Sequence, residues 1–130
     1  MQNCIFCKIA NHEIEHNTIW EDEGFIAFLD KHPQQRGHVL LIPKAHHEDI
    51  FAMPDEFYGE IFKRAKMLGS ILKTAMKSKR VGMVVDGFSV AHVHIHLIPT
   101  NVPGSLDSTN KIIFDEAEFP KIVKLLKEHF

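Results

Sequence analysis

The fold of this chain is decided by the stretch His92-Val93-His94-Ile95-His96-Leu97-Ile98, in which imidazole and apolar side chains alternate. Successive side chains of a β-strand point to opposite faces. The alternation therefore predicts a strand over residues 92–98, ended by Pro99, with three imidazoles on one face at a spacing of about 7 Å. The opposite face is apolar and belongs to a core.

Such a row of imidazoles has three interpretations from its spacing alone. It is a metal site, a polar outer face or a catalytic surface. Histidines two residues apart on a flat strand converge on one ion only with distortion, because zinc needs about 2 Å to each nitrogen. Solvated histidines on an exposed face are common in antiparallel sheets. The pattern by itself leaves the three alternatives open.

The flanking sequence predicts the remaining elements. We expect a hairpin over residues 18–30 around Glu23-Gly24, a strand over 38–42 that ends at Pro43, and a strand over 82–86. Apolar residues at helical spacing predict a long helix over residues 54–76 and a last helix over 116–129, with a loop over 100–110 between strand and last helix. The expected core includes Ile19, Trp20, Phe25, Ala27 and Phe28 from the hairpin and Phe57, Ile61, Ala65, Leu68, Leu72, Ala75 and Met76 from the long helix.

This order of elements predicts an α+β fold, with an antiparallel sheet of about five strands, one long helix and a C-terminal helix. The chain has 130 residues, which is the size of a single domain, with a core over about residues 4–100 and a C-terminal loop and helix over 101–130. The formal charge of −2 favours neither nucleic acid nor a membrane surface as a partner. No apolar stretch is long enough to cross a bilayer and the N-terminus lacks a signal peptide, so we expect a cytoplasmic protein.

A tight turn at Gly87-Phe88-Ser89 precedes the histidine run and predicts an anion cradle built from backbone N–H groups and the Ser89 hydroxyl. His38 opens the neighbouring apolar strand. An imidazole held through Nδ1 presents Nε2 as a nucleophile, and neighbouring donors neutralise a phosphate under attack. This arrangement suits phosphoryl or nucleotidyl transfer.

The run over residues 92–98 resembles the signature of the histidine-triad (HIT) superfamily. Four further blocks resemble family blocks in the same order and together cover about residues 4–100. They are Cys4-Ile5-Phe6-Cys7-Lys8-Ile9, Phe28-Leu29-Asp30, the block from Gly37-His38 to Lys44-Ala45-His46, and Gly87-Phe88-Ser89-Val90.

The resemblance, to the Hint-like branch in particular, implies a role for each matching residue. His94 attacks the α-phosphorus of a purine nucleotide and forms a covalent nucleotidyl-histidine, which water hydrolyses. His96 contacts a phosphate oxygen, His38 joins the imidazole network, and Ser89 with the backbone near Gly87 holds the phosphate or assists the leaving group. Asp30 binds the ribose hydroxyls. The purine packs on Ile5, Phe6, Ile9 and Phe28, whose alternative interpretation is ordinary core.

The family's substrates are purine nucleotides with an amine or a second nucleotide on the α-phosphate. The resemblance therefore implies a nucleoside phosphoramidase, with a dinucleoside polyphosphate hydrolase and a nucleotide-binding or scaffold protein as alternatives. The loop before the triad is short here, and Phe88 stands where relatives often have glutamine, so the leaving-group preference does not carry over. Family members are usually homodimers, which implies a homodimer here.

The Cys4-x-x-Cys7 pair indicates a metal site or a redox pair in a reducing compartment. Relatives of the bacterial type with this pair often bind structural zinc, which implies the ligands Cys4, Cys7, His46 and His92, with His47 as an alternative to His46. Two thiolates and two imidazoles are a closed tetrahedral set. The remaining histidines, His12, His16, His32 and His129, lie in polar sequence and are expected to be solvated.

Overall fold

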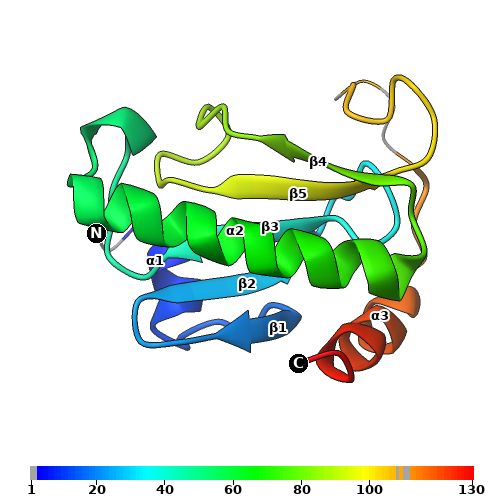
Figure 1. Cartoon of the computed structure of the whole chain (residues 1–130). Helices are drawn as coiled ribbons and strands as arrows, with labels where there is room; N and C mark the ends of the chain where they lie inside the picture. The colour runs from blue at the N-terminus through cyan, green and yellow to red at the C-terminus, as the bar shows by residue number, and fades with distance from the viewer. Residues whose placement is uncertain (1–2, 108, 110–111) are drawn as a thin grey trace.

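The computed structural model of the chain describes residues 3–107, 109 and 112–130. Five strands form one antiparallel sheet in the order β1-β2-β3-β5-β4, which confirms the predicted α+β fold (Figure 1). The strands are β1 (Thr18–Glu21), β2 (Phe25–Leu29), β3 (Val39–Pro43), β4 (Arg80–Val84) and β5 (Ile95–Thr100). The helices are α1 (Ile5–Ala10), the short 3-10 helix η1 (Ile50–Ala52), α2 (Asp55–Met76) and α3 (Glu118–Lys127).

The long helix α2 lies across one face of the sheet and encloses the main core (Figure 1). Strand residues that point to this face alternate with residues that point away, as the pleat requires. Five residues of α2 recur every three or four positions and are buried against the sheet. These residues are Ile61, Ala65, Leu68, Leu72 and Ala75, and they meet Ala27, Leu41, Ile95 and Leu97 of the central strands.

The opposite face of the sheet carries a second, smaller apolar cluster beneath α1. This cluster consists of Phe6, Ile9 and Ala10 from α1 and Ile26, Phe28, Leu40 and Ile42 from β2 and β3. Every residue of β2 and β3 is therefore buried, which explains why both strands are almost continuously apolar instead of alternating. The rest of this face, beside the cluster, carries the histidines.

Three boundaries differ from the prediction. The strand predicted over 92–98 begins at Ile95, because the preceding segment bonds outside the ladder: Val93 N–H donates to the carbonyl of His47 at 2.6 Å and His92 N–H to that of Val90 at 2.8 Å. The strand predicted over 82–86 lies at Arg80–Val84, opposite β5. Pro99 lies inside β5, where only β4 remains as a neighbour, so the missing N–H is tolerated.

Two features were not expected from the sequence. The segment Ile5–Ala10 is a helix, whose N-cap Cys4 accepts a hydrogen bond through Sγ from Cys7 N–H at 3.5 Å. Phe57, predicted to face the core, is exposed, because the first turn of α2 lies beside the loop that carries His47, whose ring centroid is 5.9 Å from that of Phe57.

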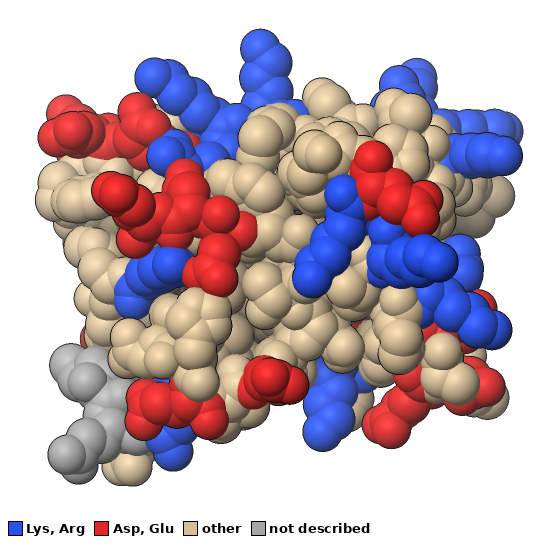
Figure 2. All heavy atoms as spheres, turned by 90° about the horizontal axis from the view of Figure 1, so that it is seen from below, with Lys and Arg blue, Asp and Glu red and all other residues tan. Residues whose placement is uncertain are grey.

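Lysine and arginine side chains are interspersed with aspartate and glutamate over most of the face seen in Figure 2. In the part of the chain that the structure describes, no helix is both long enough and apolar enough to span a membrane.

Two glycines give a matched test of the packing around α2. Gly37 has φ +88°, and a Cβ there would lie 2.9 Å from Met76 Cγ, whereas a Cβ on Gly59 in α2 meets nothing within 4 Å. We expect Gly37→Ala to lower the free energy of unfolding by about 1–3 kcal/mol through backbone strain. Gly59→Ala should raise it by about 0.5–1 kcal/mol through helix propensity. Urea denaturation measures both, and a Gly37→Ala protein as stable as wild type contradicts the packing described.

Candidate functional site

The orientation of the His94 ring follows from its neighbour in the chain. His94 Nδ1 lies 2.7 Å from the carbonyl oxygen of His92, and a carbonyl only accepts, so Nδ1 carries the proton. In the neutral ring Nε2 then holds the lone pair. His94 is 1% exposed, and no described group forms a hydrogen bond with its Nε2. The structure thus holds a buried, oriented imidazole whose basic nitrogen faces the site.

His38 and His96 form a second oriented pair, from the start of β3 and from β5. The backbone N–H of Gln34 donates to His38 Nδ1 at 3.0 Å, so the proton of the neutral His38 ring is on Nε2. This Nε2–H faces His96 Nδ1 at 2.9 Å, which places the proton of neutral His96 on Nε2. Asp30 Oδ2 lies 3.4 Å from His38 Nε2. One backbone amide therefore determines the direction of both hydrogen bonds.

The histidines line a cavity of about 500 Å³ on the sheet face that carries α1, within the size range of small-ligand pockets. A more open hollow of about 910 Å³ lies between residues 12–21 and α3, but it shares only His16 with the histidine cavity. Of the site residues predicted from sequence, the histidine cavity is lined by Ile5, Phe6, Ile9, Asp30, His38, Ser89, His94 and His96.

Two predicted residues do not line this cavity. Phe28 is fully buried behind Phe6, with ring centroids 5.6 Å apart, so it supports the wall from the core. Gly87 has φ +76° and lies outside the lining. Of the predicted anion cradle, Ser89 is exposed at the cavity, while Phe88 N–H points at Asp86 Oδ1, 3.4 Å away. That amide is therefore directed at a carboxylate.

Several further residues line the cavity, and three of them bear on its chemistry and shape. His16, expected to be solvated, is half-buried with its ring edge-on to Phe28 at 5.0 Å between centroids. Burial lowers the pKa of His16. Asp86 joins the cavity from the segment after β4, and Leu106 joins it from the loop after β5. The glycine at position 82 was the available signal for Leu106, because a Cβ there would lie 2.5 Å from its Cδ2.

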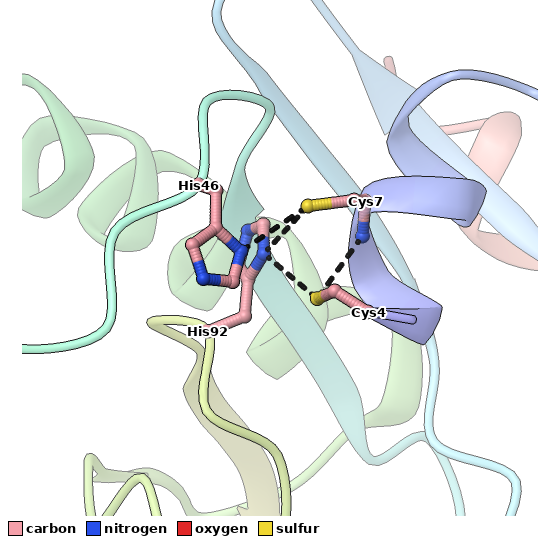
Figure 3. Close-up of side chains that lie close together, drawn as sticks. All are labelled: Cys4, Cys7, His46 and His92. Atoms are coloured by element: carbon pink, nitrogen blue, oxygen red, sulfur yellow. Dashed lines mark hydrogen bonds between the residues drawn. The ribbon is translucent and has the colours of Figure 1, made fainter. Parts of the chain in front are cut away.

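The four residues predicted as metal ligands come together beside the cavity (Figure 3). Cys7 lies in α1 and Cys4 is the N-cap residue of that helix. Both face His46, which follows β3, and His92, which precedes β5. Cys4 Sγ lies 3.4 Å from His92 Nδ1, and Cys7 Sγ lies 3.5 Å from the same atom and 3.2 Å from His46 Nδ1. Tetrahedral zinc separates sulfur and nitrogen ligands by about 3.6 Å, so these distances fit one ion.

The protonation of the His92 ring also suits metal binding. His92 Nε2 lies 2.8 Å from the carbonyl oxygen of Pro43 and must donate to it, which leaves the Nδ1 lone pair aimed at the sulfurs. Burial lowers the pKa of His92 and so favours the neutral ring. Burial raises the pKa of Cys7, an effect that a bound cation reverses. His47, the alternative ligand, packs on Phe57 instead, outside the cluster.

The comparisons with known proteins agree with this geometry. The HIT domain matches residues 11–102 of the chain. The chain belongs to the HIT family. It is 38% identical to an uncharacterized HIT-like protein of Methanocaldococcus jannaschii, over 74% of this chain and 78% of that protein. It is 36% identical to the adenosine 5′-monophosphoramidase of Saccharomyces cerevisiae, over 96% of this chain and 79% of that protein.

A solved structure from Sulfolobus tokodaii, described as a hypothetical histidine triad nucleotide-binding protein, superposes with a TM-score of 0.84. It is 31% identical and covers 97% of this chain and 91% of its own. The HIT match begins after α1 and ends just after β5. It therefore contains the triad, while Cys4 and Cys7 precede it and Leu106 follows it.

The burial of His16 leads to a pH-dependence of stability. Its pKa is lowered in the folded protein, while the unfolded chain has the ordinary value of about 6.5. As the pH falls, the unfolded chain binds this proton first, so the contribution to stability is complete above about pH 6.5 and is lost below it. We expect the free energy of unfolding to fall less between about pH 7.5 and 5 in His16→Gln than in the wild type. Identical slopes for the two proteins would show that His16 is not desolvated.

Proposed function

We propose that this HIT protein is a hydrolase that acts at the α-phosphate of purine nucleotide conjugates through a covalent nucleotidyl-histidine. The buried Nε2 of His94 carries the proposal, because it has no hydrogen-bond partner among the described residues and the hydrogen bond from Nδ1 to the His92 carbonyl leaves the lone pair on Nε2. The adenosine 5′-monophosphoramidase of Saccharomyces cerevisiae supports this class of activity. The hypothetical histidine triad nucleotide-binding protein of Sulfolobus tokodaii supports nucleotide binding.

The proposed reaction has two displacements at phosphorus. His94 Nε2 forms a bond to the α-phosphorus while the bond to the leaving amine or phosphate breaks, and the leaving group takes up a proton. Water then attacks the same phosphorus, loses a proton and releases His94 with the nucleoside monophosphate. His96 Nε2–H donates to a phosphate oxygen, since the relay from Gln34 through His38 assigns it the proton. Ser89, at the cavity, holds the phosphate or supplies the proton to the leaving group.

The nucleoside occupies the remaining part of the cavity in this proposal. Ile5, Phe6 and Ile9 of α1 form an apolar wall for the purine. Asp30 accepts hydrogen bonds from the ribose hydroxyls. One oxygen of Asp30 already accepts from His32 N–H at 2.8 Å, and a carboxylate has further lone pairs available.

The leaving group decides between two enzyme subtypes. An amine gives a nucleoside phosphoramidase and a second nucleotide gives a dinucleoside polyphosphate hydrolase. We favour the phosphoramidase, the activity named for the yeast relative. Turnover of adenosine 5′-phosphoramidate against diadenosine tetraphosphate, by kcat/KM, separates the two. A third possibility is a nucleotide-binding protein with little catalysis. Such a protein would bind nucleotide but turn over both of these substrates negligibly.

We also propose that zinc occupies the cluster of Cys4, Cys7, His46 and His92 as a structural ion. Four protein ligands leave no open coordination position, so this ion would hold α1 against the segment before β5 and take no part in bond breaking. Glu48 Oε1 lies 3.6 Å from His46 Nε2 and supports that ligand from outside. The zinc would thereby position the backbone that carries His94.

Among the described residues, the sheet ends at β1 on one side and at β4 on the other, with no further strand paired to either. An exposed strand edge is a common place for a second copy to pair. We propose a homodimer, and sedimentation measures its stoichiometry.

His94→Ala tests the nucleophile. We expect kcat for adenosine 5′-phosphoramidate to fall at least about a thousandfold, because no other group forms the covalent bond. Denaturation without acid after mixing with substrate should trap a nucleotidyl adduct in the wild type and none in the variant. His129→Ala is the control, since His129 is exposed at the C-terminus. Retained hydrolysis in His94→Ala would overturn the covalent mechanism.

The adjacent histidines His46 and His47 provide a matched test of the zinc proposal. Only His46 reaches the cysteines, so His46→Ala should lower zinc affinity at least about tenfold. His47→Ala should keep one zinc per chain. Metal analysis of the purified proteins and the shift in Tm on adding a chelator measure the difference. Equal zinc contents in the two variants would exclude this ligand set.

A further inference from the structure

Two polar side chains at the nucleoside end of the cavity take no part in the proposed mechanism. His16 lies just before β1 and Lys31 just after β2, and both line the cavity together with Asp30. The hairpin brings the two segments together, because Leu29 N–H donates to the carbonyl of Asn17 at 3.2 Å. His16 and Lys31 therefore lie at the end of the cavity where the nucleoside is proposed to bind.

A series of ring contacts places His16 on the far side of the purine wall from the nucleophile. The ring of His94 packs against that of Phe6, with centroids 5.1 Å apart, and Phe6 packs against Phe28 at 5.6 Å. His16 in turn packs edge-on against Phe28 at 5.0 Å. In the proposed complex the phosphate meets His94 and the purine packs on Phe6. The six-membered ring of the purine, which is farthest from the ribose, then lies toward His16.

The ring of His16 is available to a ligand. It is half-buried, and in the part of the chain that the structure describes neither of its nitrogens forms a hydrogen bond. Burial lowers the pKa of His16, so the ring is neutral near pH 7 and presents one donor and one acceptor. The ring also separates the cavity from the open hollow beside α3, because it lines both.

Lys31 adds a positive charge to the same end of the cavity. After burial, the charges that act on the His16 ring are those of Asp30 and Lys31. The carboxylate of Asp30 is directed at His38 and at the backbone N–H of His32, and in the described ranges no carboxylate forms an ion pair with Lys31. A lysine ammonium has three donors and no acceptor. Lys31 can therefore donate to acceptor atoms of the base.

Purines differ in what they present to such a donor. Guanine and hypoxanthine carry an oxygen at position 6 beside the acceptor N7, and a lysine can donate to both. Adenine carries at position 6 an amino group, which is itself a donor. An ammonium facing that amino group loses a hydrogen bond and gains none. The 6-oxopurines also have a hydrogen on N1, which the acceptor nitrogen of a neutral imidazole can bind.

We propose that Lys31 and His16 recognise the six-membered ring of the purine and make the site selective for guanine and hypoxanthine nucleotides over adenine nucleotides. Lys31 donates to O6 and N7, and His16 accepts from N1–H. Because the cavity must first of all bind a nucleotide, this selectivity rests on the proposed function. Neither residue touches the reacting phosphorus, so both act on binding of the base.

Calorimetry with GMP, IMP and AMP measures the selectivity without any reaction. We expect GMP and IMP to bind the wild type at least about tenfold more tightly than AMP. Lys31→Met keeps a long side chain without the ammonium, and should reduce the ratio of the AMP and GMP dissociation constants to below about threefold. Loss of the charge weakens attraction to the phosphate of both nucleotides alike, so this ratio reports on the base alone.

Two further variants control for charge and for fold. Lys66→Met is the same change at an exposed position of α2, on the other face of the sheet, and should keep the wild-type ratio. His16→Leu keeps the bulk against Phe28 but removes both nitrogens, and should weaken GMP binding at least about threefold while AMP binding changes less. Circular dichroism of each variant shows that its fold is retained.

The three nucleotides separate this selectivity from the proposed function. If none of them binds, the proposed function fails and the selectivity fails with it. If AMP binds the wild type as tightly as GMP does, or if the preference survives in Lys31→Met, the selectivity proposed here is wrong while the nucleotide site stands. A preference for GMP that IMP does not share would come from the 2-amino group of guanine, and this result also overturns the proposal.

Discussion

The hydrogen bond from His94 Nδ1 to the carbonyl oxygen of His92 determines what the cavity can do. That carbonyl is available because residues 92–94 stay outside the sheet ladder, held by the hydrogen bonds to Val90 and His47. Had the strand begun at His92, this carbonyl oxygen would have pointed toward a neighbouring strand. The backbone irregularity before β5 is therefore the source of the His94 tautomer.

The sequence predicted the larger elements because their patterns are long. Residues Ile61 to Ala75 repeat over several helical turns, and β2 and β3 are apolar throughout. It missed α1 because Phe6, Cys7, Ile9 and Ala10 span too few residues for a period to be recognised. It misplaced the start of β5 because the alternation of faces continues through Val93, which is buried, although the hydrogen-bond ladder does not. The alternation of side chains indicates which side of a segment is buried. The limits of a strand depend instead on its backbone hydrogen bonds.

The candidate site likewise contains residues that the sequence predicted and residues that it missed. His38, His94 and His96 were found because an ordered motif carries them, and the structure brings them into one cavity. His16 and Asp86 were missed because each depends on a contact outside its own element: Phe28 covers His16, and Asp86 lies close to His94 and His96. A polar residue in a polar stretch looks solvated until tertiary contacts are known.

Leu106 fills the space that Gly82 leaves open on β4 and so forms part of the cavity wall. It lies beyond residue 102, where the HIT match ends. The cavity is therefore lined both by residues inside the HIT match and by a residue beyond it. The triad lies within the match, whereas most of the segment after β5 lies beyond it. Mutation there can reshape the cavity while leaving the imidazole network untouched, provided that a small residue remains opposite on β4.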